Sequence, residues 1–349
     1  MFRFAIMGLG KIARKFATDL KLVEGATLES VASRSQSRAN DFAEEFGARY
    51  ACGSYEDLFE GPYLHCVYIA TPHPSHAELV ELCIEHGVGV LCEKPLAMNY
   101  AEVSRLVGLA RRRHVYLLEA IWTRFLPTFL AAKRRLDDGA IGEIEGLRAD
   151  LGFKLHDGHS PRITDRALGA GALLDIGIYP VFLAQVLFGA PEEITAVGRL
   201  DEHGVDVDDT IVLRYAGGRL ATLHCTLLAR TKTEAVVYGS RGTLFWDELW
   251  YQQSNFTIRP DDGEEERRYV TKAKGFGYHF EAQAVVDDLR DKRTENALWT
   301  LDDSLELHRT LTTIRERLGV RYPADEDATA SDDGGDDPVD GARRVDSRL

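Results

Sequence analysis

The residues of this chain that could carry chemistry include a lysine in an unusual place and an acid–phenol pair. Lys94 stands in Cys92-Glu-Lys-Pro95, directly after an apolar stretch, and ammonium groups avoid such positions unless they are paired. Asp175 and Tyr179 are four residues apart in a segment that predicts a helix, so they share one of its faces. Alone, such a pair is more often a structural contact than a site. Both side chains could approach Lys94 where their segments meet.

A glycine-rich turn near the start of the chain is typical of dinucleotide binding. Gly8-Leu9-Gly10-Lys11-Ile12-Ala13 follows a predicted strand and opens a predicted helix. The first glycine allows a tight turn, the second lets the backbone approach a pyrophosphate, and Ala13 keeps helix and strand close. The N–H groups at the helix start would bind the phosphates. A simple strand–helix turn could look alike, but the β-α-β order around this one favours a dinucleotide cofactor.

The end of the second predicted strand indicates which dinucleotide binds. It reads Val31-Ala-Ser-Arg34 without an acid, whereas NAD-selective sites place an acid there to bond the ribose 2′-hydroxyl. Glu29 lies mid-strand, where its side chain cannot reach the strand end. Ser33, Arg34 and Arg38 could instead hold a 2′-phosphate. The alternative is that the arginines only begin a solvated helix. The pattern favours NADP over NAD.

Two further segments follow predicted strands and face the same crevice as Lys94. They are Ala70-Thr71-Pro72-His73-Pro-Ser-His76 and Glu119-Ala-Ile-Trp122-Thr-Arg124. No metal site is predicted, because neither His73-Pro-Ser-His76 nor His156-Asp-Gly-His159 is a helical pair beside an acid.

The elements before residue 122 must position these segments, and their order predicts an α/β, doubly wound parallel sheet. Strand-like and helix-like runs alternate. The predicted strands are Phe2–Met7, Thr27–Ser33, Cys66–Ala70, Val88–Cys92 and Val115–Glu119, and the helices are Lys11–Leu20, Ser37–Phe46, His76–His86 and a fourth that Asn99 caps and that ends at Arg113. Repeated β-α-β units imply ligands at the carboxyl ends of the strands. We therefore expect residues 1–121 to form an NADP-binding Rossmann domain.

The pattern after residue 121 predicts an α+β domain with a large, mostly antiparallel open sheet. Period-two runs join around Gly217-Gly218 and around Gly239-Ser-Arg-Gly242, which are hairpin signals. The runs are Asp209–Tyr215, Arg219–Leu228, Thr233–Tyr238, Thr243–Asp247, Phe256–Pro260 and Arg267–Thr271, and helices are expected at Gly171–Phe188, His279–Arg290 and Leu301–Leu318. We expect residues 122–323 to bind substrate and form oligomers, and residues 324–349, rich in Asp and Gly, to be a disordered acidic tail.

Composition excludes several classes of protein. Of 349 residues, 44% are hydrophobic and 28% charged, as in a soluble protein, and no run of about 18 apolar residues predicts a membrane span. The net charge of −14 disfavours a nucleic-acid partner, because phosphate contacts need a basic surface. The five cysteines have no paired spacing and the N-terminus shows no cleavage site, so a cytoplasmic protein with reduced thiols is expected.

Five segments together resemble the glucose–fructose oxidoreductase/inositol dehydrogenase (Gfo/Idh/MocA) family: residues 8–13, 70–76, 93–95, 119–125 and 169–180. The resemblance extends from Phe2 to about Pro323. Residues 119–125, 171–179 and 301–323 are similar to the branch of trans-dihydrodiol dehydrogenases and NADP-dependent D-xylose dehydrogenases. Many members of the family carry His four residues after the Asp, where this sequence, like that branch, has Tyr179.

The resemblance implies hydride transfer between a nicotinamide and a carbon that bears a hydroxyl. Lys94 would bond the reacting oxygen, Tyr179 would exchange its proton, and Asp175 would orient the substrate or Lys94. A free phenol has a pKa of about 10, too high for a base at neutrality, and a nearby ammonium would favour phenolate. The residues expected around the cofactor are Gly8, Leu9, Gly10, Lys11, Ile12, Ser33, Arg34, Arg38, Thr71, Pro72, His76, Glu93, Lys94, Trp122 and Arg124, and those around the substrate are Phe153, Arg162, Asp175, Tyr179 and Phe276.

Three hypotheses of function remain open. The first is an NADP-dependent dehydrogenase of a sugar or vicinal diol, of the D-xylose or trans-dihydrodiol type. The second is a reductase of an imine or another carbonyl compound. The third is an NADP-binding regulator without catalysis, which need not keep both Lys94 and Tyr179. An aldose and an aromatic dihydrodiol both demand vicinal oxygens and an apolar wall, so the sequence does not separate them.

The family resemblance also implies a homodimer or a dimer of dimers through the outer face of the second sheet. Its strands supply more apolar surface than one layer of helices needs. The residues concerned are Leu213, Tyr215, Leu223, Tyr238, Phe245 and Trp246. The alternative is that all of them point inward and that the protein is monomeric.

Overall fold

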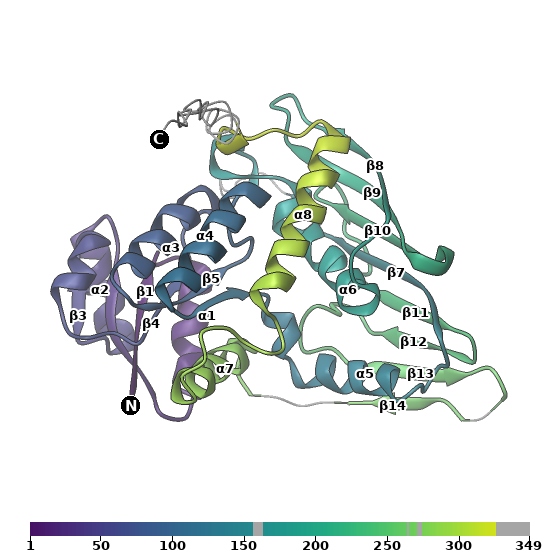
Figure 1. The fold of residues 1–349 in the computed structure, drawn as a ribbon, viewed down its shortest axis with the longest axis horizontal. Coiled ribbons are helices and arrows are strands. Elements are labelled where there is room, and N and C mark those ends of the chain that lie inside the picture. The colour runs from purple at the N-terminus through teal and green to yellow at the C-terminus, as the bar shows by residue number, and fades with distance from the viewer. Residues whose placement is uncertain (156–162, 264, 271–273, 326–349) are drawn as a thin grey trace, which may run out of the picture.

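The computed structural model describes residues 1–155, 163–263, 265–270 and 274–325, which form two domains side by side (Figure 1). The first domain contains a six-stranded sheet in the order β3-β2-β1-β4-β5-β6, with every neighbouring pair parallel. Its elements are β1 (Phe2–Met7), α1 (Lys11–Leu20), β2 (Ala26–Ala32), α2 (Gln36–Phe46), β3 (Tyr50–Cys52), β4 (Cys66–Ile69), α3 (His76–Glu85), β5 (Gly89–Glu93), α4 (Tyr100–Arg113) and β6 (Leu117–Ala120). The predicted doubly wound sheet is confirmed.

Helices cover both faces of this sheet, so its inner strands are apolar along their whole length. In β1, Phe4 and Ile6 pack with α1 and α2, whereas Ala5 and Met7 pack with α3 and α4 on the opposite face. The strand order reverses between β1 and β4, which leaves a crevice for ligands at their carboxyl ends. The short edge strand β3 was not predicted, because three residues show no period.

The second domain contains an eight-stranded sheet in the order β14-β13-β12-β11-β7-β10-β9-β8. Its strands are β7 (Ile144–Gly152), β8 (Glu193–Leu200), β9 (Asp206–Arg214), β10 (Leu220–Thr226), β11 (Ala235–Gly239), β12 (Gly242–Trp246), β13 (Phe256–Pro260) and β14 (Arg267–Tyr269). All neighbours are antiparallel except β7 and β10, and both predicted hairpins are present. The sequence analysis missed β7, where glycines interrupt the alternation, and β8, which is exposed over most of its length.

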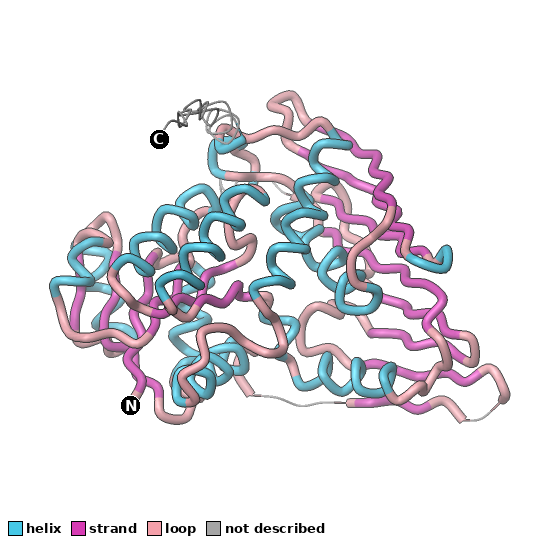
Figure 2. Tube along the Cα trace, viewed as in Figure 1, coloured by secondary structure: helices cyan, strands magenta, loops and turns pink. Residues whose placement is uncertain are grey.

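Helices lie between this sheet and the first domain, so its strands form one outer side of the molecule (Figure 2). The helices are α5 (Pro127–Asp137), α6 (Ile178–Phe188) and α8 (Leu301–Leu318), and a π-helical turn, Leu173–Gly177, precedes α6. The helical stretch Arg166–Phe188 is long and apolar enough to cross a membrane, which the sequence analysis did not expect. Of its most apolar window, 83% is buried inside the fold, as is typical of a core helix.

The apolar residues expected on the outer face of the second sheet divide between its two faces, because alternate residues of a strand point to opposite sides. Four of them pack under the helices and are at most 4% exposed: Leu213, Tyr215, Leu223 and Trp246. The expectation that they add outer surface is therefore wrong. Tyr238 is 43% exposed and, with Phe245, lines a groove of about 800 Å³ on the open face.

The folded body extends two residues further than expected. Ala324 and Asp325, assigned above to the tail, bind side chains of both domains, and the Asp325 carboxylate pairs with the buried Arg315 at 2.9 Å. Residues 326–349, the rest of the predicted tail, lie outside the described residues.

Helix α7 (Tyr278–Arg290) belongs to the second half of the chain but packs against α1 of the first domain (Figure 1). Asp19 of α1 is fully buried, and its carboxylate accepts hydrogen bonds from the N–H groups of Phe276, Gly277 and Tyr278 at 2.8–2.9 Å. These include free donors that a helix start leaves without an intrahelical partner. One carboxylate thus fixes α7, and the loop before it, on the first domain.

We expect Asp19→Ala to lower the free energy of unfolding by about 3 kcal/mol, because three backbone donors lose a buried acceptor. Urea titration followed by tryptophan fluorescence measures this change. Asp287→Ala is the control, because Asp287 lies on the exposed side of α7 beside Arg290 and should cost less than about 1 kcal/mol. Equal losses in the two variants would contradict the capping role of Asp19.

Candidate active site

The carboxyl ends of β1, β4 and β5 meet the π-helical turn of the second domain around a cavity of about 280 Å³. Its lining comes from both domains. The lining residues are Ile12, Lys15, Ala70, Thr71, His73, His76, Glu93, Lys94, Trp122, Asp175, Ile176, Tyr179, Tyr251, Gln252, Phe276 and Tyr278. Lys94, Asp175 and Tyr179 are therefore brought together, as the sequence analysis expected.

Lys94 reaches from the first domain to the second. Its Nζ donates a hydrogen bond to the main-chain oxygen of Asp175 at 2.6 Å and lies 3.8 Å from Oδ1 of the same residue. The Lys94 side chain is only 11% exposed, and these oxygens offset part of the cost of burying an ammonium. The loop that carries Lys94 is held by the buried Glu119, whose Oε1 accepts from Leu96 N at 2.8 Å.

Asp175 lies in the π-helical turn and Tyr179 in the first turn of α6, and both line the cavity. The turn begins at Leu173, whose N–H donates to Asp206 Oδ2 at 2.6 Å. Asp206 is fully buried beside Asp209, and burial together with the Asp206 carboxylate raises the pKa of Asp209 to about 9. One of the two acids is therefore protonated at neutral pH, which allows this buried pair to anchor the turn.

The phenol oxygen of Tyr179 accepts a hydrogen bond from Trp122 Nε1 at 2.8 Å. Because an indole N–H only donates, the Tyr179 hydroxyl can donate to a further group. Burial raises the pKa of Tyr179 well above its usual value, Tyr278 and Glu93 add to the rise, and the Trp122 bond opposes it. The sequence analysis expected a lowered pKa. The ammonium of Lys94 lies 5.2 Å from the ring centroid, and burial outweighs it.

Five rings of Trp, Tyr and Phe line the cavity within the described part of the chain. Trp122 stacks on Tyr278 with centroids 4.8 Å apart, and Tyr179 approaches Tyr251 to 4.9 Å. The fifth, Phe276, is 48% exposed. Flat apolar walls with a few convergent polar groups suit a ring-shaped ligand whose oxygens face one edge.

The turn after β1 has the geometry of a phosphate cradle. Gly8 has a φ of 85°, and a Cβ there would lie 2.8 Å from Ala70 main-chain atoms. A Cβ at Gly10 would meet nothing within 4 Å in the described chain, so space is open at the start of α1. Ala13 is fully buried, as expected, and the buried Thr71 Oγ1 has no hydrogen-bond partner among the described residues. The turn therefore fits a dinucleotide, whose phosphates would accept hydrogen bonds from the Thr71 hydroxyl and from the N–H groups at the start of α1.

A second cavity, of about 300 Å³, adjoins this turn. It is lined by Leu9, Gly10, Lys11, Arg14, Arg38, Asp41 and Phe42. Arg34 and Arg38 are both exposed, and both act on the phenol of Tyr55, whose pKa burial raises and the two guanidinium groups lower. Ser33 is buried at the end of β2. Arg38 thus lines the cavity beside the glycine turn, whereas Arg34 is not among its lining residues, and the contact of both arginines with a 2′-phosphate stays a prediction.

Arg124 and Phe153, for which the resemblance implied contacts with cofactor and substrate, lie outside the lining of the 280 Å³ cavity. Arg124 is partly buried, and its Nε donates a hydrogen bond to the main-chain oxygen of Leu298 at 2.9 Å. Phe153 follows β7 and packs against the hydrophobic core, also outside the lining. Arg162 lies outside the described residues.

In the first histidine motif, both ring nitrogens of His76 already have partners within the described part of the chain. His76 lines the cavity, but its Nδ1 and Nε2 face the main-chain oxygens of Pro95 and Thr71 at 2.8 and 3.0 Å. Its ring therefore links two loops of the site, and a contact of His76 with the cofactor stays a prediction. His156 and His159 lie outside the described residues, among which no cluster of His, Cys, Asp and Glu could hold a metal.

Sequence reasoning missed Tyr251, Gln252 and Tyr278, which line the cavity. The available signals were weak. Trp250-Tyr-Gln-Gln253 sets aromatic and amide groups in a loop, and Gly275-Phe-Gly277 marks a turn just before Tyr278. Neither pattern predicts which part of the fold its loop packs against.

Comparisons with known proteins agree with this architecture. A family described as "Oxidoreductase family, NAD-binding Rossmann fold" matches residues 2–120, and the GFO/IDH/MocA C-terminal domain matches residues 129–245. A trans-1,2-dihydrobenzene-1,2-diol dehydrogenase of Mus musculus is 37% identical over 335 residues, which are 93% of this chain and 98% of that protein. The Homo sapiens protein of the same name is 36% identical over 331 residues, with the same coverage of both chains.

Solved structures show the same fold. A 3-ketoreductase from Actinomadura kijaniata in complex with NADP and TDP-benzene is 28% identical, with a TM-score of 0.81 over 91% of this chain and 98% of that chain. An aldose–aldose oxidoreductase from Caulobacter crescentus also has a TM-score of 0.81, over 90% of this chain and 97% of that chain, but at 24% identity it supports the fold alone. Both domains match along nearly their whole length, and the chain belongs to the Gfo/Idh/MocA family of oxidoreductases.

Proposed function

We propose that this protein is an NADP-dependent dehydrogenase that oxidises a vicinal diol on a ring, of the trans-dihydrodiol type. The observation that carries the proposal is the cavity that gathers Lys94, Asp175 and Tyr179 between aromatic walls at the edge of the cofactor-binding sheet. The relatives named dihydrodiol dehydrogenases, at 36–37% identity over nearly the whole chain, support this substrate class. All five cysteines are free of disulfide bonds, which supports a cytoplasmic location.

Lys94 and Tyr179 both act on the reacting hydroxyl, Lys94 on its oxygen and Tyr179 on its proton. Bound NADP supplies the nicotinamide that accepts a hydride. Lys94 donates a hydrogen bond to the substrate oxygen, and the main-chain oxygen and carboxylate of Asp175 hold the ammonium in place. Tyr179 takes the hydroxyl proton, for which it must first be phenolate, and the Trp122 N–H on its oxygen stabilises that form. A regulator without catalysis would not need this pair of groups.

A substrate panel tests the proposed function. It combines trans-1,2-dihydrobenzene-1,2-diol, D-xylose and D-glucose with NADP or NAD and follows absorbance of the reduced cofactor. We expect the highest kcat/KM for the diol with NADP. A preference for D-xylose would make the protein an aldose dehydrogenase instead. No turnover of any member with either cofactor would contradict the proposal and favour a reductase of another carbonyl compound or a regulator.

Arg34→Ala should raise the KM for NADP about tenfold or more, because it deletes charge-assisted bonds to the 2′-phosphate. The KM for NAD, which lacks that phosphate, should change less than about twofold. Arg49→Ala is the matched control: Arg49 pairs with the mid-strand Glu29 at 3.6 Å, away from the strand end. Equal effects of Arg34→Ala on both cofactors would contradict the assignment.

Tyr179→Phe keeps the ring packing but removes the proton acceptor, so kcat should fall about 10²–10⁴-fold. Lys94→Ala should cost at least as much, and the double variant should lose little more than either single variant, because the two groups act as one unit. Fluorescence titration should show unchanged NADP binding. Tyr251→Phe, which changes a neighbouring ring of the same cavity, should lower kcat less than about tenfold. Near-normal turnover in Tyr179→Phe would leave Tyr179 a packing residue.

The rate of diol oxidation should rise with pH into the alkaline range. The active form of Tyr179 is deprotonated, and burial raises its pKa above the usual phenol value, so the active fraction grows up to tenfold per pH unit below that pKa. A stopped-flow rate profile from pH 6 to 10 measures the slope, and Tyr179→Phe should lose it. A plateau above about pH 7 would instead indicate an imidazole.

The open face of the second sheet is the proposed interface of a homodimer or a dimer of dimers. Tyr238 and Phe245 line the groove of this face. Light scattering should therefore report at least twice the chain mass of 38.9 kDa, and Tyr238→Glu should shift the particle towards the monomer. A 38.9 kDa particle for the unchanged protein at working concentration would contradict the interface.

A further inference from the structure

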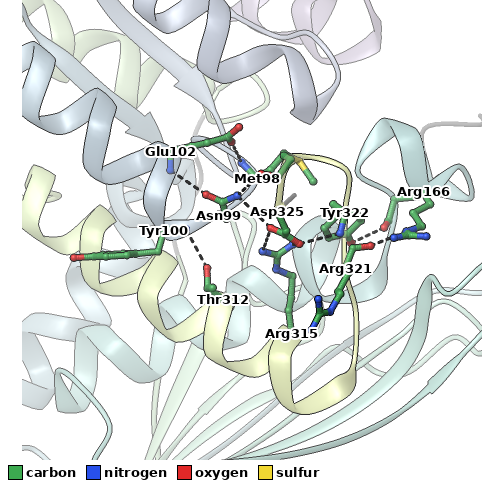
Figure 3. Close-up of polar contacts among 12 residues, drawn as sticks. Met98, Asn99, Tyr100, Glu102, Arg166, Thr312, Arg315, Arg321, Tyr322 and Asp325 are labelled. Atoms are coloured by element: carbon green, nitrogen blue, oxygen red, sulfur yellow. Dashed lines mark hydrogen bonds and ion pairs between the residues drawn. The ribbon is translucent and has the colours of Figure 1, made fainter. Parts of the chain in front are cut away.

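The chain leaves α8 at Gly319, whose φ of 75° lies in the left-handed region, and then runs along the joint between the two domains (Figure 3). We name residues 319–325 the C-terminal strap. No strap residue lines the 280 Å³ cavity. Besides Arg315 of α8, its hydrogen-bond partners nevertheless lie in the two segments that carry Lys94 and Asp175.

On the first domain, the strap binds the end of the loop that carries Lys94. Asn99 Nδ2 donates to the main-chain oxygen of Ala324 at 3.2 Å and to Asp325 Oδ1 at 3.1 Å. Asn99 is also the N-cap of α4, where its Oδ1 accepts from Glu102 N at 2.9 Å. The strap therefore holds the residue at which the Lys94 loop ends and a rigid helix begins.

On the second domain, the strap binds the segment that leads into the π-helical turn. Tyr322 Oη donates to the main-chain oxygen of Ala170 at 2.7 Å. Arg166 Nε donates to the main-chain oxygen of Arg321 at 2.6 Å (Figure 3). Ala170 precedes Asp175 by five residues, so both contacts act on the short stretch that ends at the partner of Lys94.

Asp325 joins the two sets of contacts. Besides Asn99, its carboxylate accepts from the guanidinium of Arg315 at 2.9 and 3.2 Å and from Tyr322 N at 2.9 Å. Arg315 is 3% exposed, and a nearby carboxylate is needed to offset the cost of removing its guanidinium from water. Burial alone would raise the pKa of Asp325, but Tyr322 N–H, Arg315 and Asn99 hold it below the usual range. The carboxylate is therefore charged at neutral pH.

We propose that Asp325 is a positioning residue for Lys94. Through Asn99 on one side and Arg315 and Tyr322 on the other, it fixes the spacing between the Lys94 loop and the π-helical turn. The inference rests on the proposed function, in which Lys94 bonds the reacting oxygen. A misplacement of about 1 Å at such a group can cost about a hundredfold in rate. Because the strap lies outside the cavity, its loss should slow turnover without weakening cofactor binding.

The first test compares Asp325→Ala and Asp325→Asn with a chain that ends at Asp325. We expect kcat for the diol to fall about tenfold in Asp325→Ala, and less in Asp325→Asn, which keeps the shape and one acceptor. The shortened chain keeps the strap, so its kcat should stay within about twofold of the full chain. The KM for NADP should stay within about twofold in all three.

A positioning role and a merely stabilising role differ in their coupling to Lys94. In a Lys94→Ala background, Asp325→Ala should lower kcat by a further factor of less than about two, because the group that Asp325 positions is gone. A further tenfold loss in that background would overturn the proposal, as would an unchanged kcat in Asp325→Ala alone. If Asp325→Ala does not fold, Asp325→Asn carries the same comparison.

Hydrogen exchange separates failure of this inference from failure of the proposed function, because it needs no substrate. The amides of residues 96–98 should exchange faster in Asp325→Ala than in the full chain, and the chain that ends at Asp325 should match the full chain. Unchanged exchange in Asp325→Ala would overturn the role of the strap. If no diol or sugar is oxidised, the proposed function fails, and this measurement still decides on the strap.

Discussion

The hydrogen bond from the Lys94 ammonium to the main-chain oxygen of Asp175 joins two segments 81 residues apart and makes one site out of two domains. A buried ammonium must find oxygen partners, so this contact fixes where the domains meet. Buried carboxylates anchor both ends: Glu119 holds the Lys94 loop and Asp206 holds the π-helical turn. Glu119 also contacts His308 of α8 at 2.9 Å. Burial alone would raise the pKa of Glu119, but this imidazole keeps it below its usual range.

The two sheets place these anchors. The parallel sheet ends its strands at one edge, where the Gly8 turn, the Thr71 segment and the Lys94 loop stand together. The second sheet supports α5, α6 and α8 on one face only, and α6 carries Tyr179 towards that edge. Helix α7 then returns to α1, because Asp19 supplies the acceptor that its first turn lacks. The aromatic walls of the cavity thus depend on contacts between segments far apart in the sequence.

Much of the first domain could be predicted from the sequence, because its signals are local. The turn at Gly8 needs a positive φ and a close approach to the backbone, and both requirements are visible as glycine after an apolar strand. Asp175 and Tyr179 share a face through their spacing alone. Arg124 could not be placed in this way, because its nearest acceptor, the main-chain oxygen of Leu298, lies 174 residues away. For the same reason Tyr278 escaped notice, since only the docking of α7 brings it to the cavity.

The outer strands show a second limit of sequence reasoning. Alternation of apolar and polar residues predicts that a strand has two different faces, but it does not predict which face the helices cover. Leu213 and Tyr215 could therefore be assigned to an outer surface that they do not form. The same limit hid Asp325, whose neighbours in the sequence are acidic and whose partners, Arg315 and Asn99, are revealed only by folding.

In the proposed mechanism, Lys94 and Tyr179 contact one oxygen of a bound ring diol in the cavity between the domains. A crystal structure with NADP and the diol, or a slowly turned-over analogue of it, measures this most directly. We expect one substrate oxygen within about 3 Å of both Lys94 Nζ and Tyr179 Oη, with the ring between the aromatic walls. A diol bound outside this cavity, or one whose oxygens touch neither atom, would contradict it.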